Sequence, residues 1–197
     1  MDDIKKINLF ITLLPAIIVV FIIFIILLVT DSAGGDSSIV MINGDFRPPF
    51  APEVEYTITS NFGTRVDPIN GGESFHSGID VTAPEGTDIV ASANGVVIET
   101  GYQENGLGNY VYMEHNVNGI IFYTAYGHML DDSIVVSEGQ IVYQYEKLGT
   151  IGSSGRSTGR HCHFMIMTPN LKFDKENLLD PLPIFEKDMK DKEGKNN

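Results

Sequence analysis

The stretch His161-Cys162-His163-Phe164-Met165-Ile166-Met167 sets both the expected fold and the expected site of this 197-residue chain. Side chains alternate across a β-strand, so His161 and His163 face one way and Cys162 faces the other. The four apolar residues that follow continue in the same strand-like register. Two imidazoles on one face of a strand indicate a site for a metal ion, a substrate, or both.

The remaining histidines are also grouped. Of the five in the chain, His76 stands four residues before Asp80, and His128 follows Tyr126-Gly127. The glycine and the β-branched residues around Asp80 favour an extended segment, and positions i and i+4 share a face there. An imidazole and a carboxylate can therefore point at one ion. Together with one imidazole of the 161/163 pair, they have the composition of a catalytic zinc site with a fourth position for water.

Two residues are expected to be structural. His115 lies outside these motifs, and a lone histidine is usually a surface or satisfied core residue. Strand alternation places Cys162 opposite the two histidines, so we interpret it as a small buried apolar residue. As the single cysteine of the chain, it also excludes an intrachain disulfide.

Charge narrows the choice of partners. The chain carries 26 acidic and 13 basic residues, for a net charge of −13. Binding to nucleic acid relies on basic patches that neutralise phosphates, so we expect no nucleic-acid partner.

Residues 1–29 are expected to be a short cytoplasmic segment followed by one transmembrane helix. The run 7–29 is apolar except for three residues, and at about 1.5 Å per residue it spans a hydrocarbon core of about 30 Å. A cleaved signal peptide is the alternative, but its apolar region is normally only about 7–15 residues long. Lys5 and Lys6 precede the run, and the next basic residue is Arg47. The positive-inside rule then predicts a single-pass protein of the cell membrane with its N-terminus in the cytoplasm and the rest outside.

The remainder divides into three parts. Residues 30–53 have the composition of an extracytoplasmic linker, with Gly and Ser first and Pro later. Residues 54–185 are expected to form the functional domain. Residues 186–197 are charged and nearly free of apolar side chains, which predicts a disordered tail.

The domain is expected to be mainly β. Short β-rich runs follow one another with Gly, Asn or Asp at most of the breaks, namely 88–91, 95–100, 109–115 and 119–126. No stretch after the apolar run shows a long helical period. These features predict a compact antiparallel β-sheet domain preceded by one transmembrane helix.

Residues from about 58 to 168 resemble the lysostaphin/LytM-type zinc endopeptidases, which cut peptide bonds in bacterial cell-wall peptidoglycan. The resemblance rests on many motifs in the right order: Ser60-Asn61-Phe62-Gly63-Thr64-Arg65, the stretch 75–87 around His76-Ser77-Gly78-Ile79-Asp80, Ala93-Asn94-Gly95-Val96-Val97, Gly108-Asn109-Tyr110-Val111, Tyr126-Gly127-His128-Met129, and the stretch 152–164 ending in His161-Cys162-His163-Phe164.

The resemblance implies a role for each site residue. His76, Asp80 and His163 would hold Zn²⁺. His128 and His161 would be catalytic, one as general base on the attacking water and the other stabilising the oxyanion. Where the family usually has Leu and an acidic residue, this chain has Cys162 and Met165, which concerns packing and the substrate groove.

Two classes of function follow. The first is a membrane-anchored zinc metalloendopeptidase acting on peptidoglycan, with the membrane and the wall peptide as its partners. Such a hydrolase would also suit an envelope-spanning apparatus for which the wall must be opened locally. The alternative is a non-catalytic LytM-like domain that binds wall or regulates another hydrolase. Degenerate domains of that kind lose ligands, whereas all five motif positions are present here.

Overall fold

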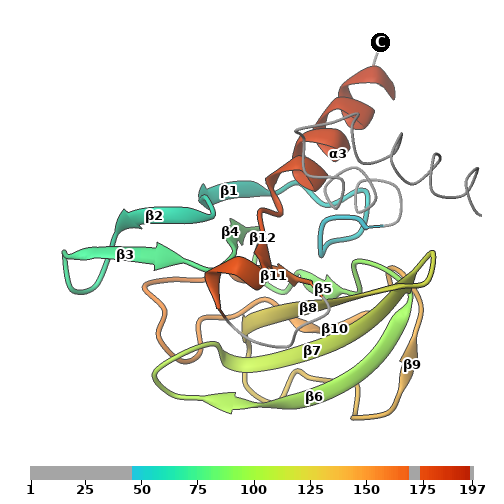
Figure 1. Cartoon of the computed structure of the whole chain (residues 1–197), viewed down its shortest axis with the longest axis horizontal. Helices are drawn as coiled ribbons and strands as arrows, with labels where there is room; N and C mark the ends of the chain where they lie inside the picture. Colours follow the sequence, from blue (N-terminus) through green and yellow to red (C-terminus); the bar gives the residue numbers. More distant parts are fainter. Residues whose placement is uncertain (1–45, 169–173, 196–197) are drawn as a thin grey trace, which may run out of the picture. The chain divides into compact units, whose positions relative to one another are not determined.

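The histidine stretch forms a central strand of an antiparallel sheet. In this computed structural model, residues 46–168 and 174–195 are described. The eight-stranded sheet has the spatial order β1-β4-β11-β8-β7-β6-β9, with β12 also paired to β11 (Figure 1). Its strands are β1 (Thr57–Ser60), β4 (Ile79–Thr82), β6 (Gly95–Gln103), β7 (Gly108–Val117), β8 (Ile120–Met129), β9 (Ile141–Val142), β11 (Cys162–Met167) and β12 (Leu178–Leu179). The mainly β, antiparallel fold expected from the sequence is confirmed.

Two smaller antiparallel pairs flank this sheet. The hairpin of β2 (Gly63–Val66) and β3 (Glu73–His76) extends to one side of it in Figure 1. The pair of β5 (Asp88–Val90) and β10 (Lys147–Thr150) is the second. The hairpin matters for the site because its second strand ends at His76.

β11 is apolar on both faces because both faces are covered. Cys162, Phe164 and Ile166 belong to one core cluster. Met165 and Met167 point to the other face and belong to a second cluster. Strand alternation separates the two sets, as expected from the sequence, and explains why the strand reads as a continuous apolar run.

The prediction of a linker at residues 30–53 is wrong for its last eight residues, 46–53, which belong to the domain. The side chains of Phe46 and Phe50 are 0% and 2% exposed. The ring of Phe46 meets His115 edge-on at 5.0 Å between centroids. The backbone of this segment is also held, because Arg47 N donates to Ser92 O at 2.9 Å. Composition alone suggests a spacer, but burying two phenylalanines outweighs it. Residues 30–45 lie outside the described part of the chain.

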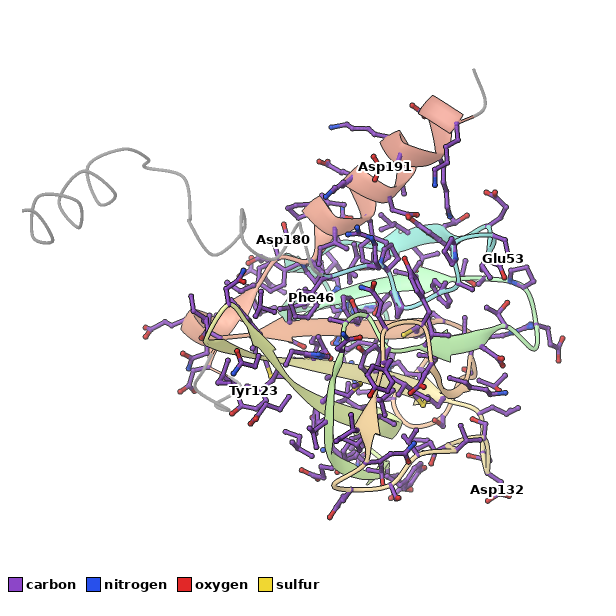
Figure 2. All side chains as sticks on the ribbon, turned by 90° about the vertical axis from the view of Figure 1, so that its right-hand side faces the viewer. Phe46, Glu53, Tyr123, Asp132, Asp180 and Asp191 are labelled. Carbon is purple, nitrogen blue, oxygen red and sulfur yellow. The ribbon has the colours of Figure 1, made fainter. Side chains whose placement is uncertain are left out.

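The prediction of a disordered tail at 186–197 is wrong for residues 186–195, because α3 spans Leu182–Lys195, and residues 196–197 lie outside the described part of the chain. The first turn is anchored by Ile184 and Phe185, which are buried. Further along, Asp188 accepts a hydrogen bond from the Tyr56 hydroxyl at 2.9 Å, and Lys192 Nζ donates to Val54 O at 3.1 Å. These long-range partners stabilise a charged helix that lacks a strong apolar period. Figure 2 shows Asp180 just before this helix and Asp191 towards its far end.

The expected transmembrane segment, residues 7–29, lies outside the described residues. In 46–168 and 174–195, no helix has the length and apolar character needed to cross a membrane.

Candidate active site

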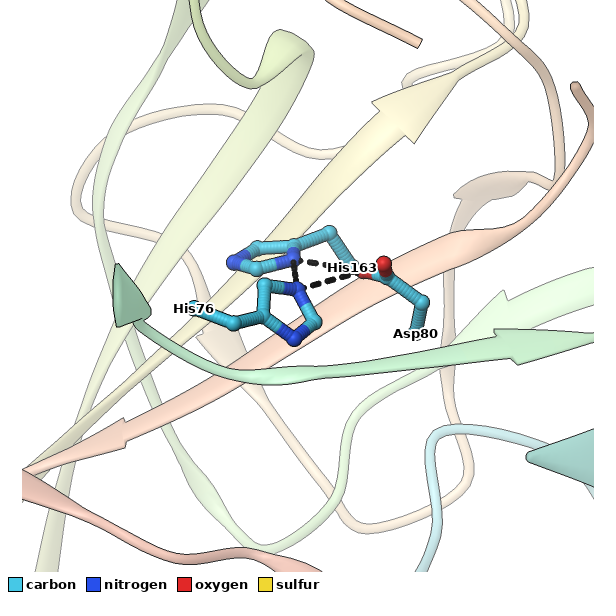
Figure 3. A group of neighbouring side chains, drawn as sticks. All are labelled: His76, Asp80 and His163. Carbon is cyan, nitrogen blue, oxygen red and sulfur yellow. Dashed lines mark hydrogen bonds and ion pairs between the residues drawn. The ribbon is translucent and has the colours of Figure 1, made fainter. Parts of the chain in front are cut away.

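Three elements bring together the side chains of His76, Asp80 and His163. His76 ends β3, Asp80 lies in β4, and His163 lies in β11 directly across from Asp80 in the strand register. The Oδ1 atom of Asp80 is 2.9 Å from His76 Nε2 and 2.8 Å from His163 Nδ1, and the two nitrogens are 3.0 Å apart (Figure 3). All three residues are buried, with 5–8% of their surface exposed. The geometry therefore joins a local pair to a residue more than 80 positions away.

The outer atoms of this triad have partners of their own. The Nδ1 atom of His76 lies 2.7 Å from the carbonyl oxygen of Asn61. A carbonyl oxygen can only accept a hydrogen bond, so Nδ1 carries the proton. The second carboxylate oxygen of Asp80 accepts a hydrogen bond from Arg65 Nη1 at 3.2 Å. These two contacts fix the orientation of the His76 ring and of the Asp80 carboxylate, as the hydrogen-bond partners of metal ligands usually do.

Burial by itself would raise the pKa of the Asp80 carboxyl. The close imidazoles of His161, His163 and His76 outweigh that effect and hold the pKa well below its usual range. The carboxylate is therefore ionised at neutral pH, which is the form that binds a cation.

The donor set fits a zinc ion. With the His76 proton on Nδ1, a neutral ring turns the lone pair of Nε2 towards the Asp80 oxygen 2.9 Å away, a contact of two acceptors. A cation between the three atoms would turn this repulsion into attraction. Tetrahedral zinc with bonds of about 2.0–2.1 Å separates its ligand atoms by about 3.3 Å, so only a small expansion is required. His76, Asp80 and His163 can thus hold Zn²⁺.

Two further histidines lie beside the triad. The ring centroids of His128 and His161 are 4.6 Å apart, and His128 is 6.0 Å from His163. The Nδ1 atoms of both rings are bound to backbone carbonyl oxygens, that of His128 to Ser154 at 2.8 Å and that of His161 to Gly159 at 2.8 Å. Each ring therefore keeps its Nε2 atom for chemistry, and His161 Nε2 is 3.5 Å from Asp80 Oδ1.

The pKa values of these two imidazoles shift in opposite directions. Burial lowers the pKa of His128 to about 4, with the nearby His161 acting in the same direction. Burial also acts to lower the pKa of His161, but the hydrogen bond and the charge of Asp80 outweigh it and raise the pKa. Two adjacent imidazoles in different environments can serve as one proton acceptor and one donor.

A pocket of about 400 Å³ opens over all five residues. One part of its rim is an ion pair between two loops: Arg156 Nη2 donates to both oxygens of Asp67 at 2.7 and 2.8 Å. Backbone hydrogen bonds from Asn70 and Ile69, followed by that of Arg156, lower the pKa of Asp67 to about 2. The hairpin β2–β3 is thereby tied to the loop that leads into β11.

Sequence reasoning missed the residues that support the site. Asn61 and Arg65 stand in a motif quoted for the resemblance, yet no role was given to them. Ser154 binds His128 through its carbonyl oxygen, which no side-chain pattern reveals. The pairing of Asp67 with Arg156 had a weak signal only, an arginine in an otherwise Gly/Ser-rich loop.

A buried donor set that fits zinc and two more histidines in the same pocket give this site the features of a metallopeptidase active site. Residues 74–181 match Peptidase family M23, which is more than half of the chain. The chain belongs to this family of peptidases, and the resemblance stated from the motifs is thereby confirmed.

Similar proteins agree with this membership. The chain is 39% identical over 129 residues to the DD-carboxypeptidase/endopeptidase Mpg of Neisseria meningitidis serogroup B, a stretch that covers 66% of this chain and 28% of that protein. It is 39% identical over 108 residues to the peptidoglycan DD-endopeptidase ShyC of Vibrio cholerae, covering 54% and 24% respectively. The chain thus spans about a quarter of the length of these relatives.

Solved structures show the same fold. The catalytic domain of lysostaphin from Staphylococcus simulans superposes with a TM-score of 0.57 at 29% identity, covering 66% of this chain and 92% of that one. A zinc-containing peptidase from Vibrio cholerae gives a TM-score of 0.57 at 30% identity, covering 71% and 39%.

Proposed function

We propose that this peptidase is a zinc endopeptidase that hydrolyses peptide bonds in bacterial peptidoglycan. The observation that carries the proposal is the buried triad of His76, Asp80 and His163, whose three inward atoms lie within 2.8–3.0 Å of one another. The peptidoglycan DD-endopeptidase ShyC is a relative with the named activity, which supports the substrate class. A non-catalytic wall-binding domain would not need the complete set of ligands and the two additional imidazoles.

The chemistry divides between the triad and the histidine pair. A zinc ion held by His76, Asp80 and His163 would supply Lewis-acid polarisation and lower the pKa of a water molecule. His128 and His161 are the catalytic groups of the proposal, because each offers an Nε2 atom beside the triad. One takes the proton of the attacking water, and the other donates a hydrogen bond to the oxygen that becomes negative. The new C–O bond then replaces the C–N bond, and the amine leaves with a proton.

Mass spectrometry of wall fragments tests the proposal. Purified peptidoglycan is digested with the full chain, with the same chain after chelator treatment, and with the chelated chain resupplied with zinc. We expect new amine and carboxyl termini in the peptide part, loss of this activity on chelation, and recovery with zinc. Intact peptide cross-links in the presence of zinc would contradict the endopeptidase function.

We further propose that the enzyme is anchored in the cell membrane by residues 7–29, with the N-terminus cytoplasmic and the domain outside. The apolar run and Lys5 and Lys6 before it support this topology. Since the domain includes Phe46, only residues 30–45 join it to the run, and fully extended they reach at most about 55 Å. Activity is then confined to nearby wall, which would suit an envelope-spanning apparatus that needs a local opening.

Protease treatment of cells from which the wall has been removed tests this topology. Digestion of the domain with the N-terminus spared is the expected result. A domain that stays protected, in cells whose membrane is shown to be sealed, would contradict both the topology and access to the wall.

A further inference from the structure

The pocket has an apolar part directly beside the histidine triad. Four of its lining side chains, Phe75, Leu107, Tyr112 and Met165, also belong to the second hydrophobic cluster of the domain. These four side chains therefore both line the pocket and pack within the apolar cluster. They come from four segments of the chain: β3, the turn before β7, β7 itself and β11.

The strand register places this apolar part next to the scissile-bond chemistry. Met165 follows His163 by two residues in β11, so both side chains point to the same face. Ala125 in β8 lies opposite Met165 in β11 and opposite Tyr112 in β7. A small residue in the central strand thus stands between the thioether and the phenol, and all three share the face of the triad.

Close contacts fix two of these side chains against the site. A Cβ atom on Gly78, in the turn between His76 and Asp80, would lie 2.8 Å from Met165 Cγ and 3.0 Å from His163 Nε2. A Cβ atom on Gly127, opposite His163, would lie 3.0 Å from Leu107 Cδ2. The two glycines therefore leave room for the apolar wall to reach the triad. Ser77 Oγ completes the junction, at 3.3 Å from His163 Nε2 and 3.6 Å from Met165 Sδ.

The charged groups in the described lining of the pocket, apart from the histidines, are already matched with one another. Arg65 pairs with Asp80 at 3.2 Å, and Arg156 pairs with Asp67 at 2.7 Å. Lys175 Nζ lies 4.5 Å from the Phe75 ring centroid but outside the lining. Burial, followed by the nearby Tyr110 and Glu99, raises the pKa of Tyr112, so its hydroxyl stays neutral. Apart from the histidines, the described lining therefore has no charged group left to pair with a charged substrate side chain, which would lose water on entering.

We propose that Met165, Tyr112, Leu107 and Phe75 form a specificity subsite that accepts an uncharged, apolar side chain of a residue flanking the cleaved peptide bond. This inference rests on the proposed endopeptidase function. Charged side chains are rejected because the subsite desolvates them, and Met165 has the greatest influence because its side chain adjoins His163. A carboxylate introduced at position 165 should turn the rejection of a cationic side chain into acceptance.

Two matched peptide series test the subsite. Each series keeps one cleavable peptide and varies a single residue on one side of the bond among Ala, Val, Lys and Glu. In one of the two series, we expect kcat/KM for the apolar peptides to exceed that for both charged peptides about tenfold or more. Equilibrium binding to the full-length zinc-loaded His161→Ala variant, which should not hydrolyse them, is expected to show the same order.

Variants of the full chain locate the effect. Met165→Glu should raise kcat/KM or affinity for the Lys peptide about tenfold relative to Ala, whereas Met165→Leu should keep the apolar preference. Val135→Glu adds the same charge at a residue 59% exposed and outside the pocket, and should leave the order unchanged. If Met165→Glu does not fold, Leu107→Glu at the half-buried neighbouring position serves in its place.

The outcomes separate the two proposals. Equal binding and cleavage of apolar and charged peptides in both series, within threefold, would overturn the subsite while leaving the endopeptidase intact. If the zinc-loaded wild type binds apolar peptides preferentially but does not hydrolyse them, the endopeptidase function is overturned and the subsite is supported. The subsite is also overturned if no peptide binds, or if Met165→Glu and Leu107→Glu both fold and leave the selectivity as it was.

Discussion

At the scale of single residues, His161 and His163 are two positions apart but have different expected functions. His163 Nδ1 faces Asp80 and His76 at 2.8 and 3.0 Å, whereas His161 Nε2 stays 3.5 Å from Asp80. His163→Ala should largely lose zinc because it removes a ligand. His161→Ala should keep zinc and lose activity by about 10²-fold or more, the usual effect of removing a general acid or base.

Metal analysis of both purified variants checks this division, with the wild type as reference and circular dichroism as the control for folding. Equal zinc content in the two variants would show that the ligand assignment is wrong.

Cys162 lies between these histidines and has no part in the site. Its side chain is 0% exposed and belongs to the core cluster on the opposite face of β11. We expect Cys162→Ala to keep its zinc content and its activity, and to lower the free energy of unfolding by about 1 kcal/mol through the lost buried group. Chemical denaturation and metal analysis measure the two quantities. A variant without zinc would contradict the alternation of the strand.

His115 is the buried histidine that the site does not use. Its Nδ1 atom lies 2.9 Å from Asn94 O, and its Nε2 atom lies 2.7 Å from Thr124 Oγ1. Burial lowers the pKa of His115 to about 4, against an unfolded value near 6.5. Between those pH values the unfolded chain binds the proton and the folded chain does not, so stability falls as the pH is lowered, by about 3 kcal/mol in all.

Denaturation of wild type and His115→Gln at pH 7 and pH 4.5 measures this contribution. We expect His115→Gln to be less stable than the wild type at both pH values. It should lose less stability than the wild type between pH 7 and pH 4.5, because glutamine does not titrate. Parallel losses in the two proteins would show that His115 is not the origin of the effect.

At the scale of elements, the Asp67–Arg156 pair joins the β2–β3 hairpin to the loop that precedes β11. The hairpin carries His76 and the loop carries Ser154, so the pair holds two supports of the site in one arrangement. Asp67→Asn and Arg156→Gln should each raise KM several-fold while leaving zinc content unchanged, because a rim that has lost the pair must become ordered when substrate binds.

The exchanged double variant Asp67→Arg/Arg156→Asp tests whether the pairing itself matters. Asp67→Arg and Arg156→Asp are also made singly, and we expect the double variant to recover part of its KM relative to the product of these two single effects. Purely additive effects would show that the two side chains act separately.

At the scale of the whole molecule, the start of the domain decides its stability. A chain beginning at Val54, the boundary suggested by composition, lacks Phe46 and Phe50, which are 0% and 2% exposed in the intact domain. Deleting two buried phenylalanines should cost several kcal/mol, comparable with the total stability of many domains. We expect a chain starting at Phe46 to melt cooperatively and one starting at Val54 to be unfolded or to melt far lower. Thermal unfolding of the two proteins compares them directly, and equal melting temperatures would contradict the role of the two rings.

Features that depend on neighbouring residues could be predicted from local patterns. Alternation in 161–167 separated Cys162 from the two histidines, and turn residues between short apolar runs indicated an antiparallel β domain. The ordered motifs indicated the peptidase family. Each of these signals lies within short stretches of the chain, so the sequence displays it without knowledge of the folded partners.

Features that depend on distant contacts became apparent in the folded structure. The pairing of β4 with β11 brings Asp80 to His163, and their functions as ligands remain predictions for metal analysis. The pairing of Asp67 with Arg156, the burial of Phe46 and Phe50, and the docking of α3 through Tyr56 all contradicted or escaped local patterns. The pairs Asp67–Arg156, Phe46–His115 and Tyr56–Asp188 each join groups more than 60 positions apart in sequence, and composition or periodicity within one segment carries no record of such partners.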